Sequence, residues 1–216
     1  MSLHIYVLPL TAYFSGDFET IFEKLSDIAG KPGKLLTPEG LVEPAPPCPD
    51  ELEVRKRRSE IGPWVTKLRE QIRQRFAVEA DWDESGGLRF STNMSYTTYS
   101  GMFEWAERGG AHQSEALNDL TTAQVYLPLP FEGTAEFDCP FGDAPLRIGS
   151  SITLRRMIEP FADAIQSNAE WRELLANAER VIHGALAEIS SARDTVDRWL
   201  HICDMSIGQR APIVTE

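Results

Sequence analysis

The sequence lacks a cysteine framework. Its 216 residues include three cysteines, Cys48, Cys139 and Cys203, which are odd in number and far apart. Disulfide-stapled secreted domains have an even, clustered set, and structural zinc sites use C-x-x-C pairs. The sequence has neither pattern. A reducing compartment is therefore expected, with the cytoplasm as the default location.

Long apolar runs are also missing. No run approaches 18 apolar residues, so no membrane-spanning helix is expected. The apolar stretch from Leu3 to Phe14 has no basic flank before it and is interrupted by Pro9, which indicates a strand and not a secretory signal. The composition is 42% hydrophobic and 25% charged, as in globular proteins. A single domain over residues 1–216 is predicted.

Local catalytic and cofactor motifs are absent as well. Gly149-Ser150-Ser151 lacks the second glycine of a nucleophile elbow, and the chain has no dinucleotide fingerprint or phosphate-binding loop. His183 and His201 are 18 residues apart, about 27 Å along a helix, too far to share a metal. No catalytic residue, cofactor or metal site is predicted. Active sites built from scattered residues leave no such pattern, so an enzyme stays open.

One segment resembles half of a calcium loop. Asp81 to Gly86 places oxygen-bearing side chains at alternate positions before a glycine. The closing carboxylate of such a loop would fall at position 92, which is threonine, and position 89 is arginine. The segment therefore lacks the last ligand and some of the charge, and a hairpin tip explains the same residues.

Charge is unevenly distributed. The net charge is −12. Residues 51–75 carry eight basic and four acidic groups, whereas residues 76–150 carry three basic and twelve acidic groups. The run Arg55-Lys56-Arg57-Arg58 is dense, but four consecutive charges point in every direction round a helix, which favours a solvated face. A protein that is acidic over most of its length is not expected to bind nucleic acid, because phosphates repel it, but it is compatible with a basic protein partner.

Periodicity and turn signals predict an α+β fold. It has a small, mostly antiparallel sheet, several helices and a long C-terminal helix or helical hairpin. A mobile, proline-rich loop is expected at 31–49. The predicted elements are a strand at 3–10, a helix from Ser15 to Gly30, a helix from Pro49 that Gly62-Pro63 breaks or kinks, a hairpin at 76–94, a helix at 99–108, strands at 123–129 and 133–138, and helices over 151–205.

The strongest regularity lies near the C-terminus. Apolar residues follow one another at alternating spacings of four and three from Trp171 to Cys203, the 3.5-residue period of a packed helical seam. One side of this seam consists of Trp171, Ala178, Ala185, Ala192 and Trp199. Two partners fit it: an antiparallel helix of the same chain, with 151–166 as the first candidate, or a second copy in a homodimer.

These features lead to a functional hypothesis with two alternatives. The acidic region and the lack of catalytic motifs favour a non-enzymatic bacterial protein-binding module that recognises a basic partner, such as a toxin or another enzyme. Asp81, Asp83 and Glu84 are its candidate acidic contacts. The aromatic run with Tyr96, Tyr99 and Trp105 is a candidate interface, or the lining of a small-molecule pocket in the first alternative. The second alternative is a structural homodimer through 171–203.

Overall fold

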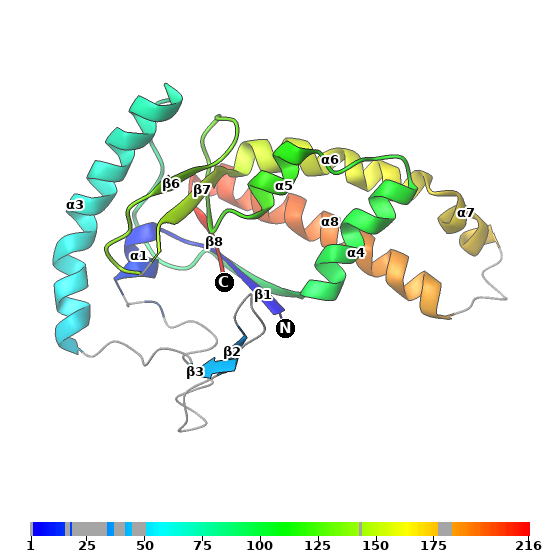
Figure 1. Cartoon of the computed structure of the whole chain (residues 1–216), viewed down its shortest axis with the longest axis horizontal. Helices are drawn as coiled ribbons and strands as arrows, with labels where there is room; N and C mark the ends of the chain where they lie inside the picture. The colour runs from blue at the N-terminus through cyan, green and yellow to red at the C-terminus, as the bar shows by residue number, and fades with distance from the viewer. Residues whose placement is uncertain are drawn as a thin grey trace.

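The structure is a computed structural model that describes residues 2–15, 18, 34–36, 42–44, 51–142, 144–176 and 183–216. It has the predicted α+β class (Figure 1). The strands are β1 (Ser2–Val7), β2 (Lys34–Leu36), β3 (Val42–Pro44), β4 (Phe90–Ser95), β5 (Val125–Leu127), β6 (Ala135–Phe137), β7 (Leu146–Ser150) and β8 (Ile213–Thr215). The helices are α1 (Leu10–Phe14), α3 (Glu51–Phe76), α4 (Tyr96–Arg108), α5 (Glu115–Thr121), α6 (Ser151–Ser167), α7 (Ala169–Ala176) and α8 (His183–Gln209).

Six strands form the main sheet, in the order β4-β1-β8-β5-β7-β6. The sheet is mixed and not uniformly antiparallel, because β5 and β7 run parallel, whereas its other four strand pairings are antiparallel. β8, the last strand of the chain, lies between β1 and β5 and pairs antiparallel with both. The predicted strands at 123–129 and 133–138 are confirmed as β5 and β6, but they are not neighbours, because β7 pairs with both of them.

The sheet is buried on both faces, and a separate apolar core lies on each side. Successive residues of β1 alternate between them: Ile5 and Val7 point into one core and Tyr6 into the other, where Leu8, the residue after the strand, is also buried. The helices α4, α5, α6 and α8 cover the first face, and α1 and α3 cover the second (Figure 1). The described residues therefore form three layers, with α3 as the long helix on the second side.

Helix α3 excludes the break, one of the two outcomes predicted at Gly62-Pro63. It begins at Glu51, as the proline and carboxylates there indicate, but it runs unbroken through Gly62-Pro63 for 26 residues. Pro63 is exposed, so the carbonyl that it leaves without an intrahelical donor is on the solvent side. On the opposite side, Ile61, Trp64, Leu68 and Ile72 are buried against the sheet. This burial keeps the helix continuous across a local helix breaker.

The predicted hairpin at 76–94 is also wrong. Residues up to Phe76 continue α3, residues 77–89 are irregular, and only Phe90–Ser95 form a strand. That strand, β4, pairs with β1 and not with residues 76–82. The alternation of apolar and polar residues wrongly predicted a strand here, because Ala80 and Trp82 are buried under α3 and not in a sheet. Gly86 does adopt the positive φ of +80° expected for the turn.

The C-terminal region packs as an antiparallel helical layer, as predicted for a partner within the chain. Ile189, Ala192, Val196, Trp199 and Cys203 of the seam are all buried. Arg155 Nε of α6 donates to Asp204 Oδ1 of α8 (2.6 Å), and Arg193 Nη1 of α8 donates to the Ala162 carbonyl of α6 (2.9 Å). Seam residues 177–182 and the predicted helix from Ser15 to Gly30 lie outside the described residues, apart from Ser15 and Phe18.

The proline-rich stretch 31–49 is described only at β2 and β3, which pair antiparallel apart from the main sheet. The short helix α1, which was not predicted, directly follows β1. Within the described ranges, no helix combines the length and the apolar character needed to cross a membrane.

Candidate functional site

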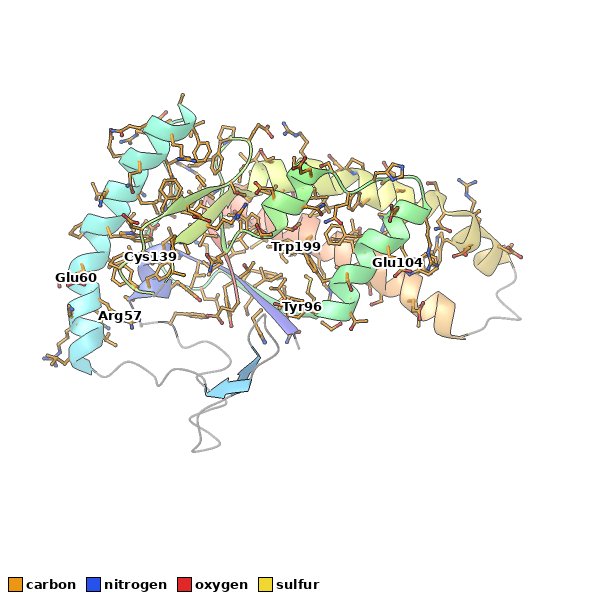
Figure 2. The ribbon with its side chains drawn as sticks, in the orientation of Figure 1. Arg57, Glu60, Tyr96, Glu104, Cys139 and Trp199 are labelled. Atoms are coloured by element: carbon orange, nitrogen blue, oxygen red, sulfur yellow. The ribbon has the colours of Figure 1, made fainter. Side chains whose placement is uncertain are left out.

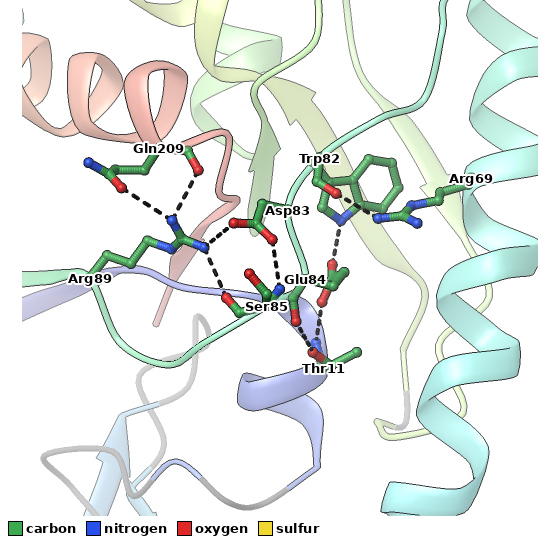
Figure 3. A network of polar contacts seen from close by, with 8 residues as sticks. All are labelled: Thr11, Arg69, Trp82, Asp83, Glu84, Ser85, Arg89 and Gln209. Carbon is green, nitrogen blue, oxygen red and sulfur yellow. Dashed lines mark hydrogen bonds and ion pairs between the residues drawn. The ribbon is translucent and has the colours of Figure 1, made fainter.

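The three predicted acidic contacts lie in the irregular segment 77–89, and all have partners within the chain. Figure 3 shows the partners of Asp83 and Glu84. Asp81 accepts a hydrogen bond from Arg210, at the end of α8. Asp83 Oδ2 accepts from Arg89 Nη2 at 2.6 Å. Glu84 Oε2 accepts from the backbone N–H of Thr11 in α1 at 2.8 Å. Asp81 and Glu84 therefore tie the segment to the end of α8 and to α1, whereas Asp83 is paired within the segment.

The charge on Asp83 is strongly stabilised. Hydrogen bonds from Ser85, first from its side chain and then from its backbone N–H (2.8 Å), hold the pKa of Asp83 well below its usual range, and Arg89 lowers this pKa further. The Arg89 guanidinium also donates to the carbonyls of Ser85 and Gln209, at 2.9 and 3.1 Å. The Asp83–Arg89 ion pair is thus the centre of a network that closes the segment.

Trp82 joins the same network from its buried side. Its indole N–H donates to Glu84 Oε1, and its backbone carbonyl accepts from Arg69 Nη2 of α3 at 2.6 Å. The Arg69 guanidinium also lies over the Trp82 ring, 4.8 Å from its centroid.

Among the described residues, no group of three or more His, Cys, Asp or Glu side chains could hold a metal ion.

The three predicted aromatic contacts are not brought together on one surface. Tyr96, at the start of α4, is exposed by 42%. Tyr99 packs between Phe103 and Trp199, with ring centroids 5.3 and 6.1 Å away, and burial raises the pKa of Tyr99 to about 12. Trp105 is buried in the core beneath α4, with Arg108 over its ring. Of these three residues, only Tyr96 presents a large apolar surface to solvent.

The predicted dimer residues are placed as follows. Ala192 and Trp199 are buried in the core that α8 shares with α4 and α6, and Trp171 of α7 is half-buried beside that core. Ala178 lies outside the described residues, and only the backbone of Ala185 is described. The homodimer stays a prediction, and Ala192 and Trp199 contribute to the fold of the single chain.

Charge is separated across the sheet. Helix α3 has eight basic and four acidic residues. On the other face, α4 to α8 together have twelve acidic and six basic residues. Figure 2 shows Arg57 of α3 and Glu104 of α4 on opposite sides of the molecule. Four of the six arginines in that helical layer, Arg108, Arg155, Arg156 and Arg193, are already in ion pairs with carboxylates. The excess charge of the layer is therefore negative.

The structure also contains a cavity that the sequence did not predict. It has a volume of about 390 Å³ and lies between α1, α3 and the turn at 86–88. Its lining combines apolar side chains, two hydroxyl groups and one guanidinium. The lining residues are Thr11, Ala12, Ser15, Phe18, Arg58, Ile61, Gly86, Gly87 and Leu88. Among the described residues of this lining there is no carboxylate, imidazole or thiol.

The two cysteines whose side chains are described are poor nucleophiles. Cys203 is fully buried on α8, and burial raises its pKa far above that of a free thiol. Burial also raises the pKa of the half-buried Cys139. A thiolate is the reactive form of cysteine, so neither residue is activated.

The chain matches no protein-family model, no curated protein and no solved structure.

Proposed function

We propose that this protein is a non-enzymatic protein-binding module whose acidic helical layer, the exposed carboxylates of α4 to α8, recognises a basic protein partner. The observation that carries the proposal is the separation of charge across the sheet, with twelve acidic and six basic residues in that layer. A toxin or another enzyme with a basic surface is the kind of partner that this charge fits.

The geometry supports a surface on the helices over one on segment 77–89. Asp81, Asp83 and Glu84 are engaged within the chain, and reversing their charge would disturb the fold before it affected a partner. Asp163 of α6 and Asp194 of α8 are exposed, and neither takes part in the ion pairs given above. Carboxylates of this kind attract a basic partner over long range and speed its association.

Tyr96 adds an apolar contact to this proposal. It is the first residue of α4, and it is among the few large apolar side chains of the described residues that are well exposed. Tyrosine is enriched at interfaces, because it combines a large apolar ring with a hydroxyl group. An exposed tyrosine beside an acidic helical layer is suited to such a contact.

The test is a comparison of two double variants with equal changes in net charge. The first, Asp163→Lys with Asp194→Lys, alters the acidic layer. The control, Glu60→Lys with Glu79→Lys, alters exposed carboxylates of α3 and of segment 77–89. Each variant and the wild type are used to capture partners from a native lysate at low and high salt, and binding of the captured protein is then measured.

Support requires a basic partner that is released at high salt, binds the first variant about tenfold more weakly or worse, and binds the control variant like the wild type. The proposal fails if no basic protein is captured at either salt concentration. It also fails if both variants lose the partner equally, because binding would then depend on net charge and not on this surface.

A further inference from the structure

The edge strand β4 lacks the features that usually protect a sheet edge from pairing with another chain. Within the described part of the chain, the main sheet ends at β4 on one side and at β6 on the other. β6 has only three residues, one of them the exposed Glu136, and short or charged edge strands resist such pairing. β4 has six residues, as many as β1, and contains neither a charged residue nor a proline. No strand among the described residues pairs with its outer side.

The register of β4 shows which of its backbone groups point outwards. His4 of β1 exchanges two backbone hydrogen bonds, 2.9 Å each, with the residue that follows β8, so its N–H and C=O point away from β4. The next residue, Ile5, therefore directs its backbone groups towards β4, where it is paired with Thr92. Thr92 in turn faces β1. Its two neighbours, Ser91 and Asn93, consequently direct their N–H and C=O groups to the outer side of the sheet.

The outward residues of β4 are accessible to solvent. Ser91, Asn93 and Ser95 are exposed, and the strand residues between and before them are half-buried or buried. Ser95 is the N-cap of α4, so its carbonyl accepts the first hydrogen bond of that helix. Ser91 and Asn93 therefore each offer both an N–H and a C=O group to a further strand, whereas Ser95 offers only an N–H.

A second copy of the chain fits this edge. Antiparallel strands are related by a two-fold axis, so the same strand supplies both halves of an isologous interface. Residues with outward groups exchange hydrogen bonds when Ser91 of one copy lies opposite Asn93 of the other, and Thr92 then lies on the two-fold axis. A register centred on Asn93 instead sets Ser91 opposite Ser95, whose carbonyl is engaged by α4. Because β4 is uncharged, no like charges of the two strands face each other across the axis.

Two exposed apolar side chains flank β4 and support this register. Among the described residues, three large apolar side chains are well exposed, and two of them are Leu88, at 45%, and Tyr96, at 42%. Leu88 precedes the strand by two residues, and Tyr96 directly follows it. The register that pairs Ser91 with Asn93, continued outwards, sets Leu88 of one copy opposite Tyr96 of the other. Pairing of the two copies therefore removes exposed apolar surface from water at both ends of the strand.

We propose that this protein forms a two-fold homodimer in which β4 pairs antiparallel with β4 of a second copy, with Ser91 of each copy opposite Asn93 of the other. The main sheet then continues through both copies. This interface differs from the seam at 171–203, where Ala192 and Trp199 are buried within the single chain. It also differs from the acidic helical layer of the proposed function, with which it shares only Tyr96, at the border between β4 and α4.

The experiment places charges at the two positions that the register sets face to face. Ser91→Lys with Asn93→Lys puts lysines opposite lysines, and Ser91→Asp with Asn93→Asp puts carboxylates opposite carboxylates. Like charges directly opposite each other destabilise a strand pair, and opposite charges stabilise it. Each double variant is therefore expected to weaken the dimer about tenfold or more, whereas an equimolar mixture of the two is expected to form heterodimers.

The measurement is sedimentation velocity of the purified full chain from micromolar to submillimolar concentration, with native mass spectrometry to identify heterodimers by their mass. The wild type is expected to reach twice the mass of the chain. The control Thr66→Lys with Gln74→Lys makes the same change in net charge as the lysine variant, at exposed positions of α3. It is expected to dimerise like the wild type.

Three results would overturn the proposal: a wild type that is monomeric at every concentration, charge variants of β4 that remain dimers, or a mixture of them that forms no heterodimer. Equal dissociation of the α3 control would also do so, because dimerisation would then depend on net charge and not on β4. The melting temperatures of the variants show that each is folded. None of these readouts involves a different protein, so failure here is distinct from failure of the proposed function.

Discussion

Glu84 caps helix α1 from 73 positions away in the sequence: its Oε2 accepts the hydrogen of the Thr11 backbone N–H at 2.8 Å. The residue at the N-cap of α1 is Pro9, whose side chain makes no capping hydrogen bond. A helix N-terminus has backbone N–H groups without intrahelical acceptors, and a carboxylate there also interacts favourably with the helix dipole. The capping group that the local sequence lacks is thus supplied by segment 77–89.

Replacing Glu84 by alanine should lower the free energy of unfolding by about 2 kcal/mol. This value combines the loss of a helix cap with the loss of the acceptor for the buried Trp82 indole N–H. Urea unfolding of Glu84→Ala measures the change. Glu79→Ala, an exposed position in the same segment, is the control and should stay within about 0.5 kcal/mol of the wild type. Equal stability of the two variants would contradict the capping role.

The Asp83 network makes stability depend on pH. The folded-state pKa of Asp83 is lowered, so its stabilising contribution is present above the unfolded-state pKa, about 4, and is lost as the pH falls below it. Asp83→Asn should therefore melt at a lower temperature than the wild type at pH 6 to 8, with the gap closing towards pH 2. Melting curves of both proteins across this range are the measurement. A gap of constant size at every pH would refute the assignment.

Gly109 is required where α4 approaches α6. A Cβ built on Gly109 would lie 2.0 Å from the carbonyl oxygen of Ala164, a backbone atom that cannot rotate away. Gly109→Ala should therefore destabilise the fold by about 2 kcal/mol, as overpacking does. Gly101→Ala, within α4, meets no atom within 4 Å and should stabilise the protein by up to about 1 kcal/mol through helix propensity. Chemical denaturation of both variants tests whether the effects have opposite signs.

Thiol labelling tests the burial of two cysteines. In a Cys48→Ser background, Cys203 should react with an aromatic disulfide reagent only as fast as the protein opens, because its side chain is fully buried and its pKa is raised. Cys139 is half-buried and should react measurably faster, at a rate that continues to increase with pH above the pKa of a free thiol. Rapid labelling of Cys203 at neutral pH would contradict the placement of α8.

Local signals predicted much of the secondary structure. Pro49, Asp50 and Glu51 marked the start of α3, and Gly109 marked the end of α4. The seam from Trp171 to Cys203 predicted a helix with one buried side, and Ile189 to Cys203 of α8 are buried on that side. Capping, helix propensity and the 3.6-residue period act over a few neighbouring residues, so a single sequence contains them.

The candidate sites were less accessible to sequence reasoning. The density of carboxylates around Asp83 suggested an exposed acidic surface, but Arg89, Arg210 and Thr11 engage these groups within the chain. The cavity joins residues from three distant segments, and Gly86-Gly87 was the only local signal near it. These two glycines indicated a turn, but they did not indicate a ligand.

The sequence by itself determined the α+β class, the positions of the long helices and the acidic character of the chain, because these depend on composition and on short-range periodicity. The tertiary structure alone decided that β8 lies between β1 and β5, that α3 continues through Pro63, and that basic and acidic helices occupy opposite faces of the sheet. Strand order, burial and ion pairing depend on contacts between residues far apart in the chain. Those contacts form only when both apolar cores assemble together.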